Sequence, residues 1–198
     1  MLFRSIMKFT VLFHEFAQSS IQSLISRYGA PKVVVEIGLF EGNTTFNLTQ
    51  HLASQNPDYK HYAIDPYGES DDLEEEVVES AEKIFKANLE EFAYKDNIEF
   101  MQMTSHDALL DLYLKGVKAD LIYIDGDHRA NAVLEDLVLG FNILNAGGIL
   151  LCDDCVAWRH ERLQDNPKLA VDAFINCYWD KVAVEQLPNG YQIAIRKL

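Results

Sequence analysis

Short apolar runs rich in β-branched residues alternate with longer helix-like stretches along this chain, and this alternation limits the possible folds more than any other feature. The strand-like runs are residues 33–37, 61–65, 98–101, 121–125 and 149–153, and the helix-like stretches are 43–55, 72–95, 106–116, 129–145 and 165–178. Alternating strands and helices are typical of βαβ units and a parallel sheet. Because the runs are almost continuously apolar, we expect helices on both faces of the sheet.

The C-terminal part of the chain departs from this alternation. Two strand-like runs, residues 182–185 and 191–195, are joined by a segment that contains Asn189-Gly190. Asn-Gly between two strand-like runs is a hairpin signal, so we expect an antiparallel hairpin to close the parallel sheet. The chain has 198 residues and neither a repeat nor a Pro/Gly/Ser-rich linker. We therefore predict one α/β domain over residues 31–198.

An N-terminal extension, residues 1–30, precedes this domain. Its apolar residues recur at the i, i+3, i+4 and i+7 positions of a helix: Phe9, Leu12, Phe13 and Phe16. This spacing predicts an amphipathic helix over residues 5–28 that packs on the domain or on a second subunit. Membrane contact is the alternative, but Lys8 and His14 interrupt the apolar run, which is too short for a span.

Charge and cysteine content narrow the partners and the compartment. The chain carries 31 Asp and Glu against 17 Lys and Arg, a net charge of −14. Nucleic-acid binding needs clustered basic residues, so we expect a small-molecule partner, no nucleic acid and no membrane. Three cysteines are too few for a disulfide framework and favour a reducing, cytoplasmic setting. Cys152 and Cys155 form a C-x-x-C, but the two aspartates between them make a thioredoxin-like redox motif the weaker interpretation.

A glycine-containing loop follows the first predicted strand, in the segment from Glu36 to Thr45. Gly38 and Gly42 permit a tight turn and a close approach of the backbone to a ligand, which would meet the free N–H groups of the next helix. Asp65 closes the second predicted strand, where an acidic side chain can accept hydrogen bonds from ribose hydroxyls. The alternative role of Asp65 is a turn or cap residue before a proline.

Acidic residues end the fourth and fifth predicted strands, at Asp125 and at Asp153-Asp154. If these strands are neighbours, the carboxylates converge, because adjacent strands lie about 4.8 Å apart. Crowded carboxylates repel one another unless a cation lies among them, and oxygen ligands favour magnesium, calcium or manganese. His128, three residues after Asp125, is a candidate general base. Capping and loop solvation are the structural alternatives for these residues.

Taken together, these motifs resemble the class I S-adenosylmethionine-dependent methyltransferases, in particular their metal-dependent O-methyltransferases and the macrocin-type sugar O-methyltransferases. The resemblance covers about residues 31–198 and rests on the glycine loop, Asp65, the segments 123–128 and 147–151, Asp153-Asp154 and the terminal hairpin. It implies a Rossmann-like sheet of seven mostly parallel strands with a C-terminal antiparallel hairpin strand and helices on both faces.

The resemblance also implies roles for individual residues. Magnesium or manganese would bind Asp125, Asp153 and Asp154, and His128 would accept the proton. Residues implied to contact S-adenosylmethionine are Glu36, Gly38, Phe40, Gly42, Thr44, Thr45, Asp65, Ser105, His106, Asp107 and Asp125. Catechol-type relatives commonly carry Asp-Asn in place of Asp153-Asp154, so the sequence favours sugar hydroxyls over phenols.

The leading hypothesis is therefore metal-assisted methyl transfer to a hydroxyl of a small metabolite, which could be a sugar, a polyol or a catechol-like compound. Because few loops are available to shape an acceptor pocket, a homodimer is a candidate arrangement for completing it. A nicotinamide-dependent oxidoreductase is one alternative, disfavoured by Phe40 in the glycine loop and by the reversed hairpin. A cofactor-binding protein without catalysis is the other, since fold does not determine function.

Overall fold

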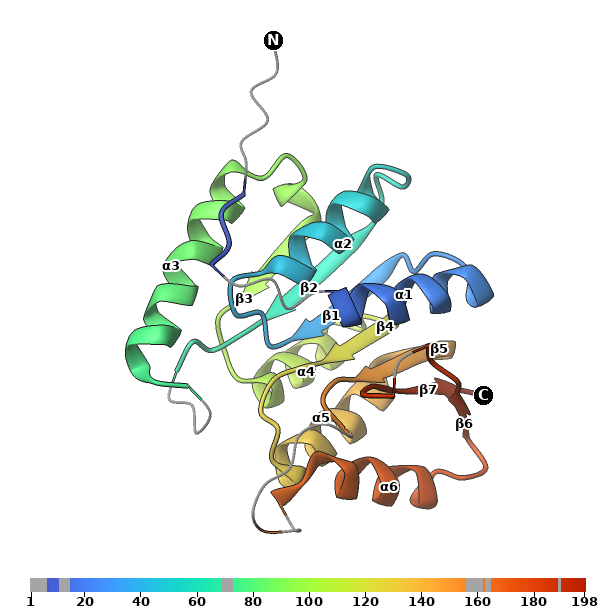
Figure 1. Ribbon diagram of the computed structural model, residues 1–198. Coiled ribbons are helices and arrows are strands. Elements are labelled where there is room, and N and C mark those ends of the chain that lie inside the picture. Colours follow the sequence, from blue (N-terminus) through green and yellow to red (C-terminus); the bar gives the residue numbers. More distant parts are fainter. Residues whose placement is uncertain (1–6, 11–14, 69–72, 156–161, 163–164, 189) are drawn as a thin grey trace.

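The protein is built on one seven-stranded sheet with the strand order β3-β2-β1-β4-β5-β7-β6 (Figure 1). The computed structural model describes residues 7–10, 15–68, 73–155, 162, 165–188 and 190–198. The strands are β1 (Val33–Ile37), β2 (Lys60–Ile64), β3 (Ile98–Met101), β4 (Ala119–Ile124), β5 (Leu144–Cys152), β6 (Val182–Glu185) and β7 (Ile193–Lys197). Strands β1 to β5 pair in parallel, whereas β7 is antiparallel to both β5 and β6. The predicted Rossmann-like sheet with its antiparallel closing strand is confirmed.

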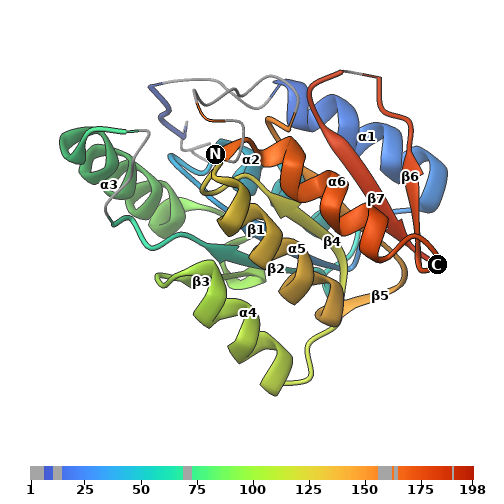
Figure 2. The same ribbon diagram turned by 90° about the horizontal axis from the view of Figure 1, so that it is seen from below.

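Helices cover both faces of this sheet, as the apolar strands predict (Figures 1 and 2). The helices are α1 (Glu15–Tyr28), α2 (Asn43–Ala53), α3 (Glu75–Glu91), α4 (Ser105–Leu114), α5 (Ala130–Ile143) and α6 (Pro167–Cys177), with a short 3-10 helix η1 (Lys95–Asn97). The side chains of β4 alternate between two cores. Leu121 and Tyr123 join the core under α1 and α2, while Ile122 and Ile124 join the core under α4, α5 and α6.

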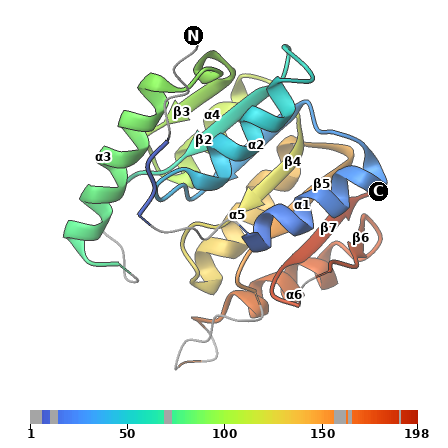
Figure 3. The ribbon, with the colours of Figure 1, turned by 45° about the horizontal axis from the view of Figure 1, so that its top comes forward.

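The N-terminal extension differs from its prediction at the start. Residues 7–10 are not helical, so a single helix over residues 5–28 is wrong there. The backbone of Lys8 instead bonds the side chain of Asn88 on α3 in both directions, N–H to Oδ1 at 3.1 Å and Nδ2 to C=O at 2.9 Å. These bonds satisfy backbone groups that a helix would pair internally. Figures 1 and 3 show this segment beside α3.

The predicted apolar stripe is only partly described. Phe9 packs its ring 6.3 Å from the ring of Phe46 on α2, from an extended segment rather than from a helix face. Leu12, Phe13 and the side chain of Phe16 lie outside the described residues. Helix α1 itself rests on the sheet through Ile21 and Leu24.

The C-terminal hairpin is confirmed, with a later second strand than predicted. Strand β7 begins at Ile193, so the connection from β6 covers residues 186–192, of which Asn189 lies outside the described residues. Among the helices that the structure describes, none has the length and apolar character needed to cross a bilayer.

Candidate active site at the carboxyl edge of the sheet

The glycine loop between β1 and α2 is shaped by two left-handed glycines, Gly38 (φ 84°) and Gly42 (φ 79°). A Cβ on Gly38 would lie 2.0 Å from the carbonyl oxygen of Asp125, so only glycine lets the end of β1 approach the end of β4 this closely. The loop continues into α2, whose first turn has no side-chain cap among the described residues. The N–H groups of that turn are therefore available to a ligand.

Two buried polar atoms in this first turn of α2 lack a hydrogen-bond partner among the described residues. They are Nδ2 of Asn43 and Oγ1 of Thr45, on side chains that are almost fully buried. Buried polar groups are normally paired, so their presence beside the glycine loop fits a polar ligand at this position. Thr44, between them, is half-buried. The three residues lie where the cofactor is predicted to bind.

Asp65, directly after β2, holds the glycine loop in place. Its Oδ2 accepts the N–H groups of Leu39 (2.9 Å) and Phe40 (3.3 Å), and its Oδ1 accepts the N–H of Tyr67 (2.8 Å). Burial raises the pKa of the Asp65 carboxyl, and these three backbone bonds act in the opposite direction. The residue is half-buried. Asp65 thus combines the turn role and a position next to the predicted ribose site.

Tyr67 is a part of this site that sequence reasoning missed. Its hydroxyl donates to the carbonyl of Phe40 at 2.6 Å, and both residues have left-handed backbones, at φ 47° and 49°. Burial, together with the charge of Asp65, raises the pKa of the Tyr67 phenol. The bond between Tyr67 and Phe40 thus links the two loops whose N–H groups Asp65 accepts. A tyrosine two residues after the strand-ending acid was the only signal in the sequence.

Glu36 lies away from the loop surface, in a buried polar cluster under α2. Its Oε2 is 2.8 Å from Nε2 of His61, and both side chains are buried. The other ring nitrogen, Nδ1, is 2.9 Å from the hydroxyls of Thr49 and Tyr59. Glu36 therefore supports the loop from below through β2 and α2, and its cofactor contact remains a prediction.

Two of the three predicted strand-end carboxylates, those of Asp125 and Asp154, come together, because β4 and β5 are neighbours with Ile124 opposite Cys152. Asp125, His128 and Asp154 each offer a ligand atom within 4.8 Å of the others. Nε2 of His128 is 3.8 Å from Oδ1 of Asp125 and 3.5 Å from Oδ2 of Asp154. The two carboxylates offer oxygen ligands suited to a divalent cation, and the imidazole beside them could serve as a base or as a further ligand.

Electrostatics at these carboxylates reflect burial and mutual repulsion. Burial raises the pKa of Asp125 to about 7, helped by the charge of Asp153 and opposed by hydrogen bonds from His128 and Tyr123. The pKa of Asp154 is raised by burial and then by Asp153, and His128 opposes this. A cation would relieve this repulsion.

Asp153 lies beside this group but is not one of the three residues whose ligand atoms converge. Its Oδ2 accepts hydrogen bonds from the Tyr123 hydroxyl and from Nε2 of Gln192 (2.8 Å), and its Oδ1 accepts the N–H of Asp154 (2.8 Å). Tyr123 and Gln192 are site residues that the sequence did not reveal, because Tyr123 lies within β4 and Gln192 in the segment that leads into β7.

The predicted adenine-side residues lie at the start of α4. Thr104 caps this helix by accepting the N–H of Asp107 (3.2 Å), and His106 Nδ1 is 2.8 Å from Oε1 of the exposed Glu135. Ser105 is half-buried, and its side chain hydrogen-bonds Asp136. Of the three predicted residues, Ser105 is the one that reaches into the molecule.

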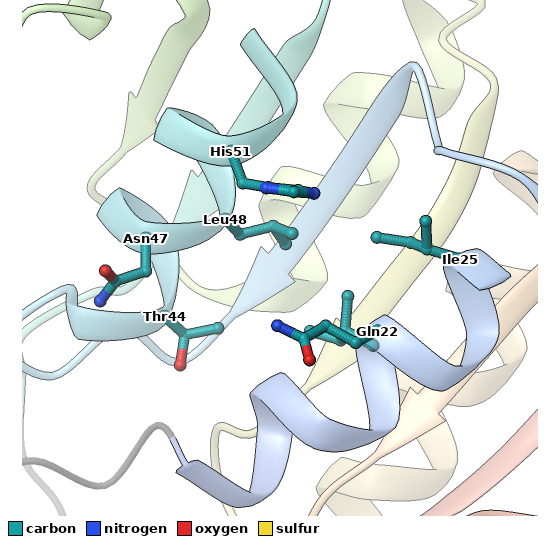
Figure 4. Close-up of a pocket in the computed structure, with 7 residues that line it drawn as sticks. Gln22, Ile25, Thr44, Asn47, Leu48 and His51 are labelled. Carbon is teal, nitrogen blue, oxygen red and sulfur yellow. The ribbon is translucent and has the colours of Figure 1, made fainter. Parts of the chain in front are cut away.

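Two hollows lie outside the cluster of strand-end acids, and the first touches the first turn of α2 at Thr44. A cavity of about 80 Å³ between α1 and α2 is lined by Ile21, Gln22, Ile25, Thr44, Asn47, Leu48 and His51 (Figure 4). It has room for a few waters but not for a cofactor. A cleft of about 620 Å³, which includes Lys118, Asp120 and Gly147, lies near the amino ends of β1 and β4. Neither coincides with the strand-end residues.

Comparison with protein families and curated proteins points to one family. A model of the methyltransferase domain matches residues 35–155, which include the glycine loop and the strand-end acids. An uncharacterized protein of Acanthamoeba polyphaga mimivirus is 30% identical over 132 residues, covering 63% of this chain and 52% of that protein. The chain thus spans about half the length of this curated relative.

Several solved structures share the fold at low identity. A Staphylococcus aureus protein provisionally described as a caffeoyl-CoA O-methyltransferase has 17% identity and a TM-score of 0.66, covering 95% of this chain and 86% of that chain. A Clostridium thermocellum protein provisionally described as an rRNA methylase has 16% identity and a TM-score of 0.64. The match covers 91% of this chain and 96% of that chain. TomG from Streptomyces achromogenes is an O-methyltransferase of tomaymycin synthesis whose structure was solved with S-adenosylmethionine. It has 18% identity and a TM-score of 0.63, and the match covers 92% of this chain and 80% of that chain.

Proposed function

This chain is a class I methyltransferase of the methyltransferase domain family, and on that premise we propose that it methylates a hydroxyl of a small metabolite with divalent-metal assistance. The methyl donor is S-adenosylmethionine. The acceptor is a sugar, polyol or catechol-like compound, and magnesium or manganese is the cation. We favour a small acceptor over a nucleic acid because the chain carries a net charge of −14.

The observation that carries this proposal is the contact between the glycine loop and the carboxylate loop. Gly38 packs against the carbonyl of Asp125, and the Asp125 N–H donates to Ile37 at 2.9 Å. A methyl donor on the glycine loop would therefore lie beside an acceptor held near Asp125, His128 and Asp154. Transfer requires such alignment of the acceptor oxygen with the S–CH₃ bond.

We assign the following roles to the chain's own residues. Asp125 and Asp154 hold the cation, which when bound orients the acceptor and lowers the pKa of its hydroxyl. His128, within 4 Å of both carboxylates, takes the hydroxyl proton on Nε2 as the oxygen attacks the methyl group. The C–S bond of the donor breaks, which leaves S-adenosylhomocysteine and the methyl ether. Asp65 and the N-terminus of α2 hold the donor.

Cofactor binding is tested by thermal unfolding with S-adenosylmethionine, S-adenosylhomocysteine and NAD. A ligand at about 100 times its Kd stabilises the fold by about 2.7 kcal/mol, so the first two should raise Tm and NAD should not. Asp65→Ala should abolish the rise, whereas Asp58→Ala, at an exposed position before β2, should keep it. An equal rise with NAD would contradict the assignment of the cofactor.

Catalysis is tested by release of S-adenosylhomocysteine with panels of sugars, polyols, catechols and, for contrast, ribosomal RNA. Turnover with a small hydroxyl compound is expected. Binding of S-adenosylmethionine without turnover on any of these would favour a non-catalytic cofactor-binding protein. Methylation of the RNA alone would contradict the small-molecule proposal.

We further propose that a second copy completes the acceptor pocket. The side chains of Asp125 and Asp154 remain about a third exposed, at 32% and 36%, so the described loops do not enclose them. Light scattering of the purified protein should give the mass of a dimer; a monomer that turns over at full rate would contradict this arrangement.

A further inference from the structure

We propose that Tyr123 is a positioning residue for the cation site, and that Asp153 is its partner in that role rather than a ligand. The Tyr123 hydroxyl lies within hydrogen-bond distance of Oδ2 of both Asp125 and Asp153, between which it shares its one proton, and it thereby fixes the Asp125 carboxylate with Oδ1 toward His128 and Asp154. This inference rests on the proposed function, because it concerns how the chain holds the proposed cation.

The arrangement follows from the two-residue period of three neighbouring strands. Tyr123 and Asp125 share one face of β4, and Leu151, opposite Tyr123 on β5, shares that face with Asp153. On β7, Ala194 lies opposite Leu151, and Gln192 precedes it by two residues. These side chains therefore form adjacent rows on the α1 and α2 side of the sheet, with their polar groups at the carboxyl edge.

Tyr123 is held firmly enough to orient its neighbours. Its side chain is 2% exposed and packs in the core under α1 and α2. Only its hydroxyl reaches the polar edge, where it lies 3.0 Å from Oδ2 of Asp125 and in hydrogen-bond contact with Oδ2 of Asp153. A buried ring with a polar tip has few alternative positions, so the hydroxyl acts as a fixed point.

Asp153 is satisfied as an anion without a cation. Three donors serve its two oxygens: the Tyr123 hydroxyl, Gln192 Nε2 and the Asp154 N–H. These bonds occupy three of the about four acceptor positions of its carboxylate, so Asp153 has fewer positions left for a cation than Asp125 has. Asp125 differs, because Tyr123 contacts only its Oδ2, while Oδ1 faces Nε2 of His128 at 3.8 Å. Asp125 and Asp154 are thus the carboxylates directed toward one point.

Hydrogen bonds behind a metal ligand fix its orientation, and their loss typically lowers metal affinity about 10- to 100-fold. Tyr123→Phe removes the hydroxyl and keeps the ring, so the packing of the sheet should survive. Tyr59→Phe is the matched control. Tyr59 is fully buried in the same core and also loses one hydroxyl contact, to His61, away from the carboxylates.

The experiment is a titration of the full-length, metal-free protein with Mn²⁺, with free Mn²⁺ read by electron paramagnetic resonance. We expect Tyr123→Phe to raise the Mn²⁺ Kd about 10- to 100-fold, Tyr59→Phe to leave it within about twofold, and Asp154→Asn to abolish binding. Asp153→Asn should cost no more than Tyr123→Phe. Circular dichroism and Tm confirm that each variant is folded.

The outcomes separate this inference from the proposed function. Equal affinity of Tyr123→Phe and the unaltered protein, or loss of binding in Asp153→Asn as complete as in Asp154→Asn, overturns the inference alone. Failure of the unaltered protein to bind Mn²⁺ overturns both the inference and the metal assistance. Absence of methyl transfer with normal Mn²⁺ binding overturns only the proposed reaction.

Discussion

Asp136, on α5, should make the protein less stable as the pH rises. Its side chain is 2% exposed, and its Oδ1 has no hydrogen-bond partner among the described residues. Burial raises the pKa of its carboxyl to about 7, aided by the charges of Glu135 and Asp127 and opposed by the hydrogen bond with Ser105. In the unfolded chain the pKa of an aspartate is about 3.9.

The sign follows from proton binding. Between about pH 4 and 7 the folded protein keeps the proton on Asp136 and the unfolded chain does not, so the free energy of unfolding falls as the pH rises through this window. A folded-state pKa higher by about three corresponds to about 4 kcal/mol over the whole window, and to about 2 kcal/mol between pH 5.5 and 7. Asp136→Asn stays neutral and escapes this loss.

We therefore expect the stability of Asp136→Asn relative to the unaltered protein, measured as the difference in free energy of unfolding, to be about 2 kcal/mol higher at pH 8 than at pH 5.5. Urea unfolding at the two pH values measures it. Asp172→Asn, at an exposed position on α6, makes the same chemical change and should show no such rise. A difference for Asp136→Asn that is the same at both pH values would refute the reasoning.

Four other predictions concern the edge of the sheet and the extension. Gly38→Ala should lower the free energy of unfolding in urea by well over 2 kcal/mol, because the new Cβ would lie 2.0 Å from a backbone oxygen. Gly116 is also left-handed but borders open space, so Gly116→Ala should lower it by only about 1 kcal/mol. A chelator should stop methyl transfer but should not change the rise in Tm that S-adenosylhomocysteine causes. Full activity in the presence of chelator would refute the role of a cation. His128→Ala should lower turnover about 10²-fold and leave the Mn²⁺ Kd within a few-fold; a large loss of affinity would make His128 a ligand. Deleting residues 1–10 should lower Tm, because Thr10 bonds the buried Glu41 through its N–H (2.6 Å) and its hydroxyl, and an unchanged Tm would show that these bonds are not stabilising.

Much of the fold follows from local patterns in the chain. The strands β1, β3 and β6 coincide with the predicted runs because each is an apolar stretch bounded by polar or turn residues. β5 starts five residues before its prediction, at Leu144 rather than Ile149. Gly147 and Gly148 look like a turn in sequence, but they belong to an irregular part of the strand where the register with β4 shifts. The sequence does not distinguish a glycine-containing bulge from a turn.

The candidate site was predictable where it depends on strand order and not where it depends on side-chain direction. Asp125 and Asp154 could be brought together because consecutive parallel strands end at one edge. The turn of Asp153 toward Tyr123 is accompanied by a bond from Gln192, which lies 39 residues away in sequence, directly before the antiparallel strand β7. The pairing of Glu36 with His61 likewise needs the register of β1 on β2, which no local pattern encodes.

Backbone strain identifies the same edge without reference to any related protein. The non-glycine residues with positive φ in the described chain are Phe40, Tyr67 and Asp154, each near 48°. Each costs roughly 1–2 kcal/mol and persists only where surrounding bonds impose it. Here those bonds come from Asp65, which accepts the N–H groups of Phe40 and Tyr67, and from Asp153, which accepts that of Asp154. The strain thus lies in three loops at the carboxyl ends of β1, β2 and β5. Strain of this kind is typical of ligand sites, and the opposite edge carries no such residue among those described.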